Sequence, residues 1–373
     1  MKLAFCLYKY FPFGGMQRDF LRIARECAAR GHEVRAYVLE WEGDAPAELE
    51  VIRVAARGLS NIARYRDYSA RVRDALERDP VDRVVGFNKM PGLDYYYAAD
   101  PCFAEKARSR RPWWYRLGAR YRHFRRYEQR VFAPGGHTHV MVITERQKRE
   151  FRHHYGTEEH RFSLLPPGID EDRRAPADRQ ARRAAFRQAR GHGDEDILLL
   201  HVGSDFSRKG LDRAIRTLAS LHGSDNANAW LYVLGEDREA PYQRLAEQLG
   251  VAEHVCFLGG RDDVPSFLLG ADLLLHPAYD ETGGIVLVEA LVAGLPVVAT
   301  DTCGFAFHVE RAGGGTVIPS PFRQQALDES VRQAVQDAAL RQHWQDNCLA
   351  YARDPELYRS SQKAADIILG AAR

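Results

Sequence analysis

The chain has 373 residues, of which 45% are hydrophobic, 10% aromatic and 28% charged, and its formal net charge is +2. At roughly 150 residues per domain, this length predicts about two domains, each able to bury a full core. The composition is that of a folded, soluble protein and excludes the disordered, collagen-like and membrane-spanning classes.

The N-terminus predicts a first core strand. Its apolar run is followed by Lys9 without a small-residue cleavage site, so we expect no signal peptide and a cytoplasmic protein. The longest apolar stretch, 283–300, contains Glu289 and a Gly-Leu-Pro breaker, so we expect no transmembrane helix. The cysteines are scattered without a CxxC pair, which favours buried free thiols over disulfides or a zinc site.

Short apolar runs alternate with amphipathic stretches from end to end, which predicts strand–helix–strand units around parallel sheets. In the first half the helical patterns are clearest at 16–30 and at 61–78, the second ending before Pro80. The candidate strands of this half are 2–8, 33–39, 50–55, 82–87, 139–143 and 162–165.

A break at Leu165-Pro166-Pro167-Gly168, followed by a polar stretch with Pro176, predicts an interdomain connection. The sequence therefore predicts two similar doubly wound domains, residues 1–167 and 168–355. A last helix, at about 356–373, is assigned to the first domain. The candidate strands of the second half are 197–203, 229–235, 254–258, 272–276, 296–300 and 316–318.

A double glycine follows the first strand and precedes the first helix. Gly14 and Gly15 can let backbone N–H groups approach a phosphate at the positive end of that helix, and a tight turn explains the pair equally well. The GxGxxG dinucleotide pattern is absent. This disfavours a nicotinamide cofactor, although Glu40 ends the second strand where a ribose-binding acid would lie.

Adjacent cations form the second motif, in VGSDFSRKGLD at 202–212. Arg208 and Lys209 follow an apolar strand and precede a helix. Two fixed cations at the carboxyl end of a strand can bind a diphosphate and neutralise the charge that builds on it as it leaves. A solvated loop is the alternative, and the Walker pattern GxxxxGK[ST] is missing.

The third and most specific motif has two glutamates around a glycine turn, followed by the sequence AGLPVVAT. Glu281 precedes the turn, and Glu289 lies about one turn into the next helix between apolar neighbours. A buried carboxylate there is costly unless donors such as ribose hydroxyls satisfy it. The free N–H groups of Gly283, Gly284 and Ile285 suit a phosphate.

These three motifs together resemble retaining glycosyltransferases of the GT-B type, family 4. The segments FCLYKYFPFGGMQRDF, DRVVGFNKMPGLD, LLPPGI, VGSDFSRKG and ADLLLHPAY are similar to the lipopolysaccharide core glucosyltransferases that add the first hexose to an inner-core heptose. The resemblance covers essentially the whole chain. It implies an α/β fold of two Rossmann-like, doubly wound parallel-sheet domains that face each other across a cleft.

The resemblance also implies the roles of single residues. Arg208 and Lys209 clamp the diphosphate, Glu281 contacts the sugar, and Glu289 holds the ribose. The broad family has an arginine where this chain has Ser204, so the match of each cation to a phosphate stays open. The other donor-binding residues that it implies are Gly14, Gly15, Asp19, Arg173, Gly203, Arg261, Thr282, Gly283, Gly284 and Ile285.

Asp100 takes the place of a histidine that the broader family often has near the reacting sugar. We assign it to the acceptor or the sugar, as a fourth catalytic candidate beside Arg208, Lys209 and Glu281. A helix cap is the alternative.

Residues 103–132 form a basic, aromatic segment, which we call the arm. It carries ten Lys or Arg against Glu105 and Glu128, a local charge of +8 that leaves the remainder at −6. Cations and Trp or Tyr rings together suit an anionic lipid surface. A solvated helix packed by its aromatics and a nucleic-acid site are the alternatives, and we expect no nucleic-acid partner. The residues expected to face the membrane are Arg110, Arg111, Trp113, Trp114, Tyr115, Arg116 and Arg120.

The sequence thus predicts a hexosyltransferase at the cytoplasmic face of the inner membrane, where anionic lipids are its partners. It would use a UDP-sugar and a phosphorylated lipopolysaccharide inner-core acceptor. UDP-glucose is the expected donor, with UDP-N-acetylgalactosamine as the alternative. A UDP-sugar epimerase and a non-catalytic lipid-binding adaptor are the rivals. No cofactor or metal is expected, and the acidic triplet 194–196 is interpreted as a solvated turn.

Overall fold

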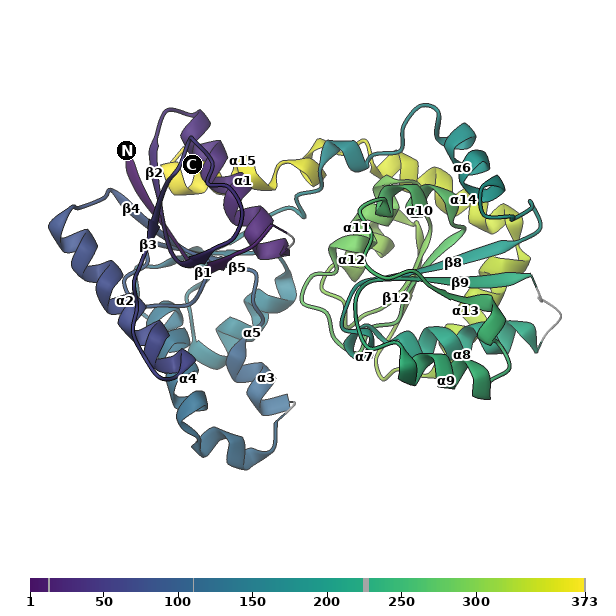
Figure 1. Cartoon of the computed structure of the whole chain (residues 1–373), viewed down its shortest axis with the longest axis horizontal. Coiled ribbons are helices and arrows are strands. Elements are labelled where there is room, and N and C mark those ends of the chain that lie inside the picture. Colours follow the sequence, from purple (N-terminus) through teal and green to yellow (C-terminus); the bar gives the residue numbers. More distant parts are fainter. Residues whose placement is uncertain (13, 110, 224–227, 372–373) are drawn as a thin grey trace. The chain divides into compact units, whose positions relative to one another are not determined.

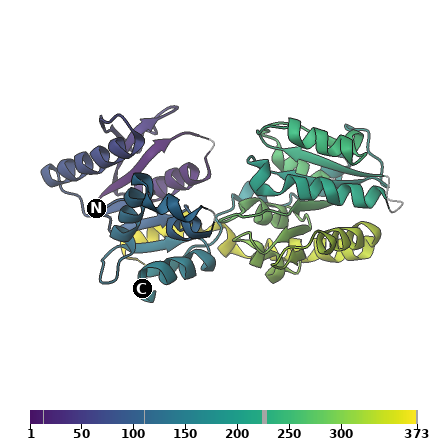
Figure 2. The ribbon, with the colours of Figure 1, turned by 90° about the horizontal axis from the view of Figure 1, so that it is seen from below.

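The computed structural model describes residues 1–12, 14–109, 111–223 and 228–371. The chain divides into two compact units, residues 1–168 with 359–373 and residues 169–358 (Figure 1). Each unit is built on one parallel sheet with helices on both of its faces (Figure 2). The sequence places the domain changes at residue 167 and at about 356, and the structure has them at Gly168 and Arg359.

The first unit has a seven-stranded sheet in the order β3-β2-β1-β4-β5-β6-β7, with all neighbours parallel. The direction of strand addition reverses between β1 and β4, and doubly wound sheets bind ligands beyond the carboxyl ends of strands at such a point. The strands are β1 (Lys2–Tyr10), β2 (Glu33–Trp41), β3 (Glu50–Arg53), β4 (Arg83–Gly86), β5 (Tyr95–Ala98), β6 (His139–Val142) and β7 (Phe162–Leu164).

Six α-helices accompany this sheet in the part of the unit that the structure describes. The last of them, which follows the whole second unit in the sequence, packs on the first helix, where Asp366 accepts a 2.6 Å hydrogen bond from Arg30. The helices are α1 (Gly15–Ala29), α2 (Asn61–Arg78), α3 (Phe103–Ser109), α4 (Ala119–Phe132), α5 (Glu145–Tyr155) and α15 (Ser360–Leu369).

The second unit repeats the plan with six parallel strands in the order β10-β9-β8-β11-β12-β13. Here the reversal falls between β8 and β11. The strands are β8 (Ile197–Val202), β9 (Ala229–Leu234), β10 (Val255–Phe257), β11 (Leu273–His276), β12 (Val297–Thr300) and β13 (Gly315–Ile318). The helices are α6 (Arg179–Gln188), α7 (Phe206–Lys209), α8 (Leu211–His222), α9 (Ala240–Gln248), α10 (Val264–Gly270), α11 (Ile285–Val292), α12 (Ala306–Ala312), α13 (Gln324–Gln336) and α14 (Ala338–Tyr351).

The apolar strands are buried on both faces, which explains why they are visible in the sequence. Along β1, Leu3, Phe5 and Leu7 pack in the cluster that includes α1 and α15, whereas Ala4 and Cys6 pack in the cluster on the opposite face. Parallel strands of this kind have continuous apolar runs rather than an alternating pattern. Each predicted strand matches a strand of the structure to within about two residues, and β5 was not predicted.

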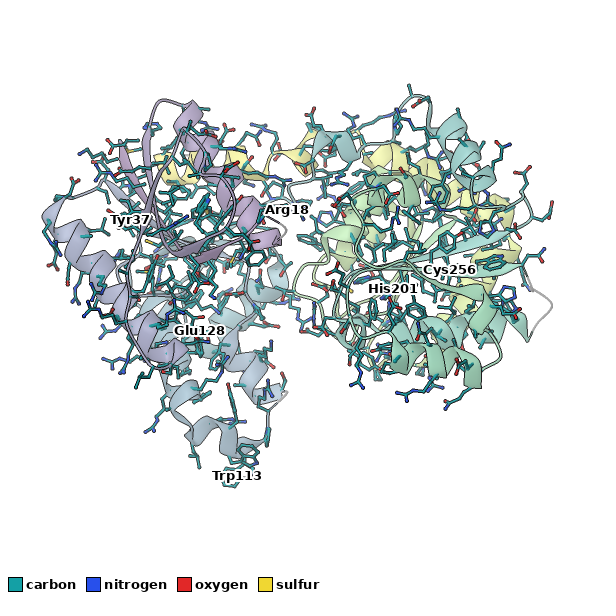
Figure 3. The ribbon with its side chains drawn as sticks, in the orientation of Figure 1. Arg18, Tyr37, Trp113, Glu128, His201 and Cys256 are labelled. Carbon is teal, nitrogen blue, oxygen red and sulfur yellow. The ribbon has the colours of Figure 1, made fainter. Side chains whose placement is uncertain are left out.

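The six cysteines are free, as predicted; Cys256 is half-buried and the others are buried. Figure 3 shows Cys256 among the side chains of the second unit. Over the described ranges, no helix combines the length and apolar character needed to cross a membrane. The same residues contain no cluster of three or more His, Cys, Asp or Glu side chains that could hold a metal ion.

A fully buried carboxylate, Glu128 of α4, holds the arm against the rest of the first unit (Figure 3). It accepts hydrogen bonds from the backbone N–H groups of Phe103 (2.8 Å) and Ala104 (3.0 Å) at the start of α3, and from the hydroxyl of Tyr155 in α5. It also pairs with the ammonium group of Lys89, which follows β4, at 2.7 Å. The side chain of Glu128 therefore connects α3, α4, α5 and the loop after β4.

Both members of this pair are charged. Burial would raise the pKa of Glu128, but the positive charge of Lys89 and the donated hydrogen bonds hold that pKa below its usual value. Burial would likewise lower the pKa of Lys89, and the carboxylates of Glu128 and Asp100 outweigh it and raise the pKa. The ion pair is consequently present at neutral pH.

We expect Glu128→Gln to lower the free energy of unfolding by about 3 kcal/mol or more, because it leaves a buried ammonium group without its anion. Urea unfolding at pH 7 measures this change. Glu77→Gln is the control, since Glu77 is 69% exposed and lies 3.7 Å from Arg73, and it should have no measurable effect. Equal stability of the two variants would contradict the role of Glu128.

Candidate functional site

The adjacent cations Arg208 and Lys209 lie in α7, just beyond the carboxyl end of β8. Asp205, which has a φ of +64°, begins this short helix by accepting a hydrogen bond from the backbone N–H of Arg208. Gly210 ends it with a φ of +76°, and a Cβ atom there would lie 2.1 Å from the carbonyl oxygen of Pro277. Only glycine allows this approach of the β8 loop to the β11 loop.

Glu281, in the loop after β11, meets both cations. Its carboxylate accepts a 2.8 Å hydrogen bond from Nη1 of Arg208 and another from Nζ of Lys209. The loop is fixed by backbone bonds between Glu281 and the segment after β12, from its N–H to Thr302 (3.2 Å) and from Gly304 to its carbonyl (2.9 Å). Motifs 72 residues apart thus form one charged cluster at the reversal point of the sheet.

The cluster is partly shielded from water. The side chains of Lys209 and Glu281 are each 12% exposed and that of Arg208 is 34% exposed. Burial would lower the pKa of Arg208, but the carboxylates of Glu281 and Asp205 outweigh it and raise the pKa. Arg208 also donates to the carbonyl of Asp280 at 3.1 Å, so its guanidinium group has a defined direction.

Helix α11 begins next to this cluster. Gly284, with a φ of +89°, is its N-cap residue, and a Cβ atom there would lie 3.2 Å from Cγ of Glu281. The first N–H groups of such a helix have no carbonyl one turn earlier and can bind an anion. Glu289 lies in the second turn and is half-buried, whereas the sequence predicted a buried acid. The apolar residues around it in the sequence pack inward and leave its own position nearer the surface.

Two histidines, which the sequence analysis missed, lie beneath the cations. His201 of β8 and His276 of β11 are fully buried, with ring centroids 5.9 Å apart. His201 bonds to the carbonyl of Leu275 at 3.0 Å, and neither ring nitrogen of His276 has a partner among the described residues. The sequence pattern that could have identified them is a histidine near the end of each apolar run, ILLLHV and LLLH.

These histidines are neutral at physiological pH. Burial and the charge of Lys209 lower the pKa of His201 to about 4 and the pKa of His276 well below its ordinary value. Figure 3 shows His201 inside the second unit. The two histidines therefore place no positive charge next to Arg208 and Lys209.

The other predicted donor-binding residues of the second unit fall into two groups, two that lie beside the charged cluster and two arginines that have partners near them in the sequence. Gly203 follows β8 with a φ of +130°, and a Cβ atom there would lie 3.2 Å from Cε of Lys209. Thr282 is half-buried beside Glu281. Arg261 instead pairs with Asp263 at 2.6 Å, and Arg173 lies 3.7 Å from Asp172. The structure thus groups Gly203 and Thr282 with the charged cluster and gives the two arginines local partners.

In the first unit the double glycine begins α1. Gly14 is the N-cap residue with extended backbone, and a Cβ atom there would overlap the side chain of Gln17, which donates to the carbonyl of Lys9 at 3.1 Å. Asp19, one turn into α1, accepts a 2.7 Å hydrogen bond from the hydroxyl of Tyr97. The start of α1 therefore lies at the carboxyl end of β1.

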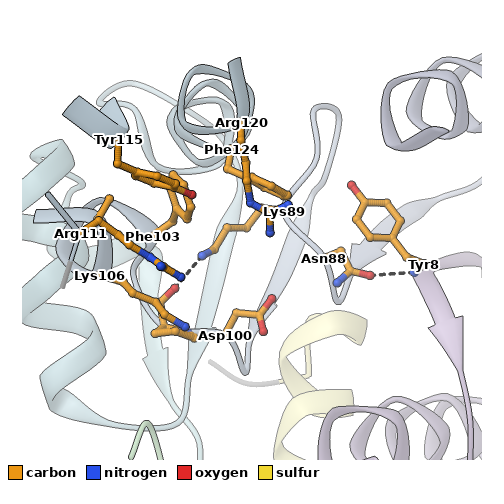
Figure 4. A pocket seen from close by; sticks show the side chains of 12 residues that line it. Tyr8, Asn88, Lys89, Asp100, Phe103, Lys106, Arg111, Tyr115, Arg120 and Phe124 are labelled. Carbon is orange, nitrogen blue, oxygen red and sulfur yellow. Dashed lines mark hydrogen bonds between the residues drawn. The ribbon is translucent and has the colours of Figure 1, made fainter. Parts of the chain in front are cut away.

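Asp100 does not cap a helix, so that alternative is wrong. The first two N–H groups of α3, those of Phe103 and Ala104, are taken by Glu128, 25 and 24 residues further along the chain. Asp100 instead lines a cavity at the carboxyl ends of β1, β4 and β5 (Figure 4). Its backbone carbonyl is held by Gln147 at 3.1 Å.

The arm consists of α3, a 3-10 helix at Trp113–Leu117 and α4. Trp113 and Trp114 are 72% and 60% exposed, and Figure 3 shows Trp113 at the end of the arm. Arg116 is exposed beside them. Arg110, also predicted to face the membrane, lies outside the described residues. The arm thus exposes large apolar rings among cations.

Comparisons with known proteins agree with this architecture. The family model of "Glycosyl transferases group 1" matches residues 182–349, and that of "Glycosyltransferase Family 4" matches residues 13–173. The chain is 50% identical over 370 residues to the lipopolysaccharide glucosyltransferase WaaG of Escherichia coli (strain K12), with 99% of each chain covered.

Solved structures give the same result. The crystal structure of WaaG, "a glycosyltransferase involved in lipopolysaccharide biosynthesis", matches with a TM-score of 0.90 at 50% identity, covering 99% of this chain and 100% of that one. Anabaena HepE, solved with UDP-glucose, shares the fold with a TM-score of 0.75 at 18% identity, covering 99% and 100%.

Fold and matches together define a glycosyltransferase of the GT-B type, as the sequence predicted. More particularly, the chain belongs to the family of lipopolysaccharide glucosyltransferases that includes WaaG.

Proposed function

We propose that the protein transfers a hexose from a UDP-sugar to an inner-core heptose of lipopolysaccharide, with retention of the anomeric configuration. The observation that carries this proposal is the cluster of Arg208, Lys209 and Glu281 beside the start of α11. Two oriented cations and open helix N–H groups suit the diphosphate of a nucleotide sugar. The 50% identity to a lipopolysaccharide glucosyltransferase supports the acceptor class.

In the proposed mechanism, the bond between the anomeric carbon and the UDP oxygen breaks as the acceptor oxygen forms its bond on the same face. The acceptor proton passes to a phosphate oxygen of the departing UDP. Arg208, Lys209 and the N-terminus of α11 stabilise the charge that develops on the diphosphate. Glu281 accepts hydrogen bonds from sugar hydroxyls and keeps the two cations in place before the donor binds.

Glucose is the proposed donor sugar, as in the name of the E. coli relative. Thr282 and Gly283 adjoin Glu281 in the segment where sugar substituents would be sensed. A small residue there also leaves room for an N-acetyl group, so UDP-N-acetylgalactosamine is the second candidate. We propose that neither donor needs a metal, because side-chain cations and helix N–H groups supply the positive charge.

Product analysis with a truncated core acceptor tests this function. In excess EDTA, we expect mass spectrometry to show transfer from UDP-glucose with a higher kcat/KM than from UDP-galactose or either N-acetylated counterpart, and NMR to show an α-linkage. Preference for an N-acetylhexosamine would contradict glucose as the donor. Conversion of the donor without acceptor would indicate an epimerase, absence of UDP release an adaptor, and loss of activity in EDTA a metal requirement.

Replacing Lys209 separates catalysis from binding. We expect Lys209→Ala to lower kcat by about 100-fold or more, because charge on the leaving diphosphate is greatest in the transition state. The Kd for UDP, measured by calorimetry, should rise by about tenfold or less. Lys363→Ala, at an exposed position of α15, is the control and should leave both constants unchanged. An unchanged kcat in Lys209→Ala would refute the role.

We further propose that the arm docks on anionic lipid at the cytoplasmic face of the inner membrane. Its cations gain about 1 kcal/mol each near such a surface, and Trp and Tyr rings favour the interface. The exposed rings of Trp113 and Trp114 are the support for this proposal. Peripheral docking would bring the enzyme to a membrane-embedded acceptor.

Sedimentation with liposomes tests the docking. We expect binding to acidic liposomes that weakens with salt and is lost in Trp113→Ser/Trp114→Ser, with little binding to neutral ones. Leu59→Ser is the matched control, because Leu59 is an exposed apolar residue outside the arm. Equal binding to acidic and neutral liposomes would remove the electrostatic claim.

A further inference from the structure

The cavity that contains Asp100 lies wholly in the first unit (Figure 4). It opens beyond the carboxyl ends of β1 and β4, the point where the strand order reverses and where doubly wound sheets bind their ligands. Residues of the arm form the side of the cavity opposite the sheet. The volume is about 270 Å³, slightly below the roughly 300–1,000 Å³ of common small-molecule sites. One monosaccharide with a single substituent fits that size better than a nucleotide does.

Four cations and one acid line this cavity, namely Lys89, Lys106, Arg111, Arg120 and Asp100. The charge of Lys89 is already compensated by Glu128. Among residues 1–12, 14–109, 111–223 and 228–371, no carboxylate forms an ion pair with the other three cations. The lining therefore keeps an excess of positive charge in a concave space, which attracts an anion.

The two arginines are held in place although they are exposed. The guanidinium carbon of Arg111 lies 5.6 Å from the ring centroid of Tyr115, and that of Arg120 lies 5.1 Å from that of Phe124. Stacking of this kind orients a guanidinium group and leaves its N–H donors free for an anion. In Figure 4 the side chain of Lys89 and the carboxylate of Asp100 extend into the same space.

The rest of the lining suits a sugar. Phe103, Tyr115 and Phe124 supply apolar ring surfaces against which the C–H face of a sugar ring can pack. Asp100 provides acceptors for hydroxyl groups. Asn88, whose Oδ1 accepts from the N–H of Tyr8 at 2.7 Å, keeps its NH₂ group as a donor. Hydroxyl-binding groups and unpaired cations thus share one cavity.

We propose that this cavity is an acceptor subsite that binds a sugar bearing a phosphate or carboxylate group. Lys106, Arg111 and Arg120 bind the anion, and Asp100 and Asn88 orient the hydroxyls of the same sugar. This inference rests on the proposed transfer to lipopolysaccharide. It adds that the enzyme recognises its acceptor through a charged sugar substituent as well as through the membrane.

Kinetics with a deacylated acceptor test the subsite, because the acceptor then has no lipid chains. The variant is Lys106→Gln/Arg111→Gln/Arg120→Gln, and all three positions are exposed, so the fold is not at risk. We expect its KM for the native deacylated acceptor to rise by at least about tenfold. Its KM for the UDP-sugar and its rate of donor hydrolysis should stay the same.

Chemical changes to the acceptor identify the anion. Phosphatase treatment or reduction of the carboxylates should raise the KM of the wild-type enzyme, and an acceptor stripped of both groups should show equal KM values for wild type and variant. The matched control, Arg73→Gln/Arg149→Gln/Lys363→Gln, removes three exposed cations outside the cavity and should behave as wild type.

Failure of the proposed function and failure of the subsite proposal give different results. If the wild-type enzyme transfers no sugar to any core acceptor, the proposed function is wrong. If it transfers sugar and the cavity variant has an unchanged acceptor KM, the subsite proposal is overturned. A variant with unchanged KM for the deacylated acceptor that no longer binds acidic liposomes would show that the cations bind lipid headgroups, which also overturns it.

Discussion

The carboxylate of Glu281 allows two cations to lie side by side at the edge of the second sheet. Arg208 and Lys209 would repel each other and move apart in water, yet both donate to this one acid, and the two histidines below them stay uncharged. The loops after β8 and β11 can approach because Gly210 lies against Pro277. The charge distribution of the site is therefore built into the protein, and in the proposed function a diphosphate would meet cations that are already oriented.

In the first unit, too, a carboxylate compensates a cation, and this carboxylate is fully buried. Glu128 compensates Lys89 and takes the N–H groups of α3, so the arm is fastened to the sheet by one fully buried anion. This fastening explains how a segment with so many cations can fold back on itself. Glu128 does not reach Lys106, Arg111 and Arg120, the other three cations of the cavity, where external anions can compensate them.

Apolar runs predicted most of the fold because parallel strands are buried on both faces. The exception, β5, has three tyrosines in its four residues and follows a turn, so it lacked the aliphatic run that marked the others. The charged cluster was predictable in part, since its residues adjoin glycine turns at strand ends. The local partners of Arg261 and the capping of α3 by Glu128 were not, because they depend on side-chain packing between segments. The half-buried position of Glu289 depends likewise on how α11 turns against its sheet.

The return of the chain to the first unit through α15 has a consequence for biosynthesis. Residues 169–358 are continuous and can fold as soon as they leave the ribosome. The first unit begins earlier in the chain but lacks Ala364, Ala365 and Ile368, which belong to its buried core, until α15 has been synthesised. The apolar surface of α1 therefore stays uncovered until α15 has been synthesised. A truncation that removes α15 would therefore damage the unit that was synthesised first.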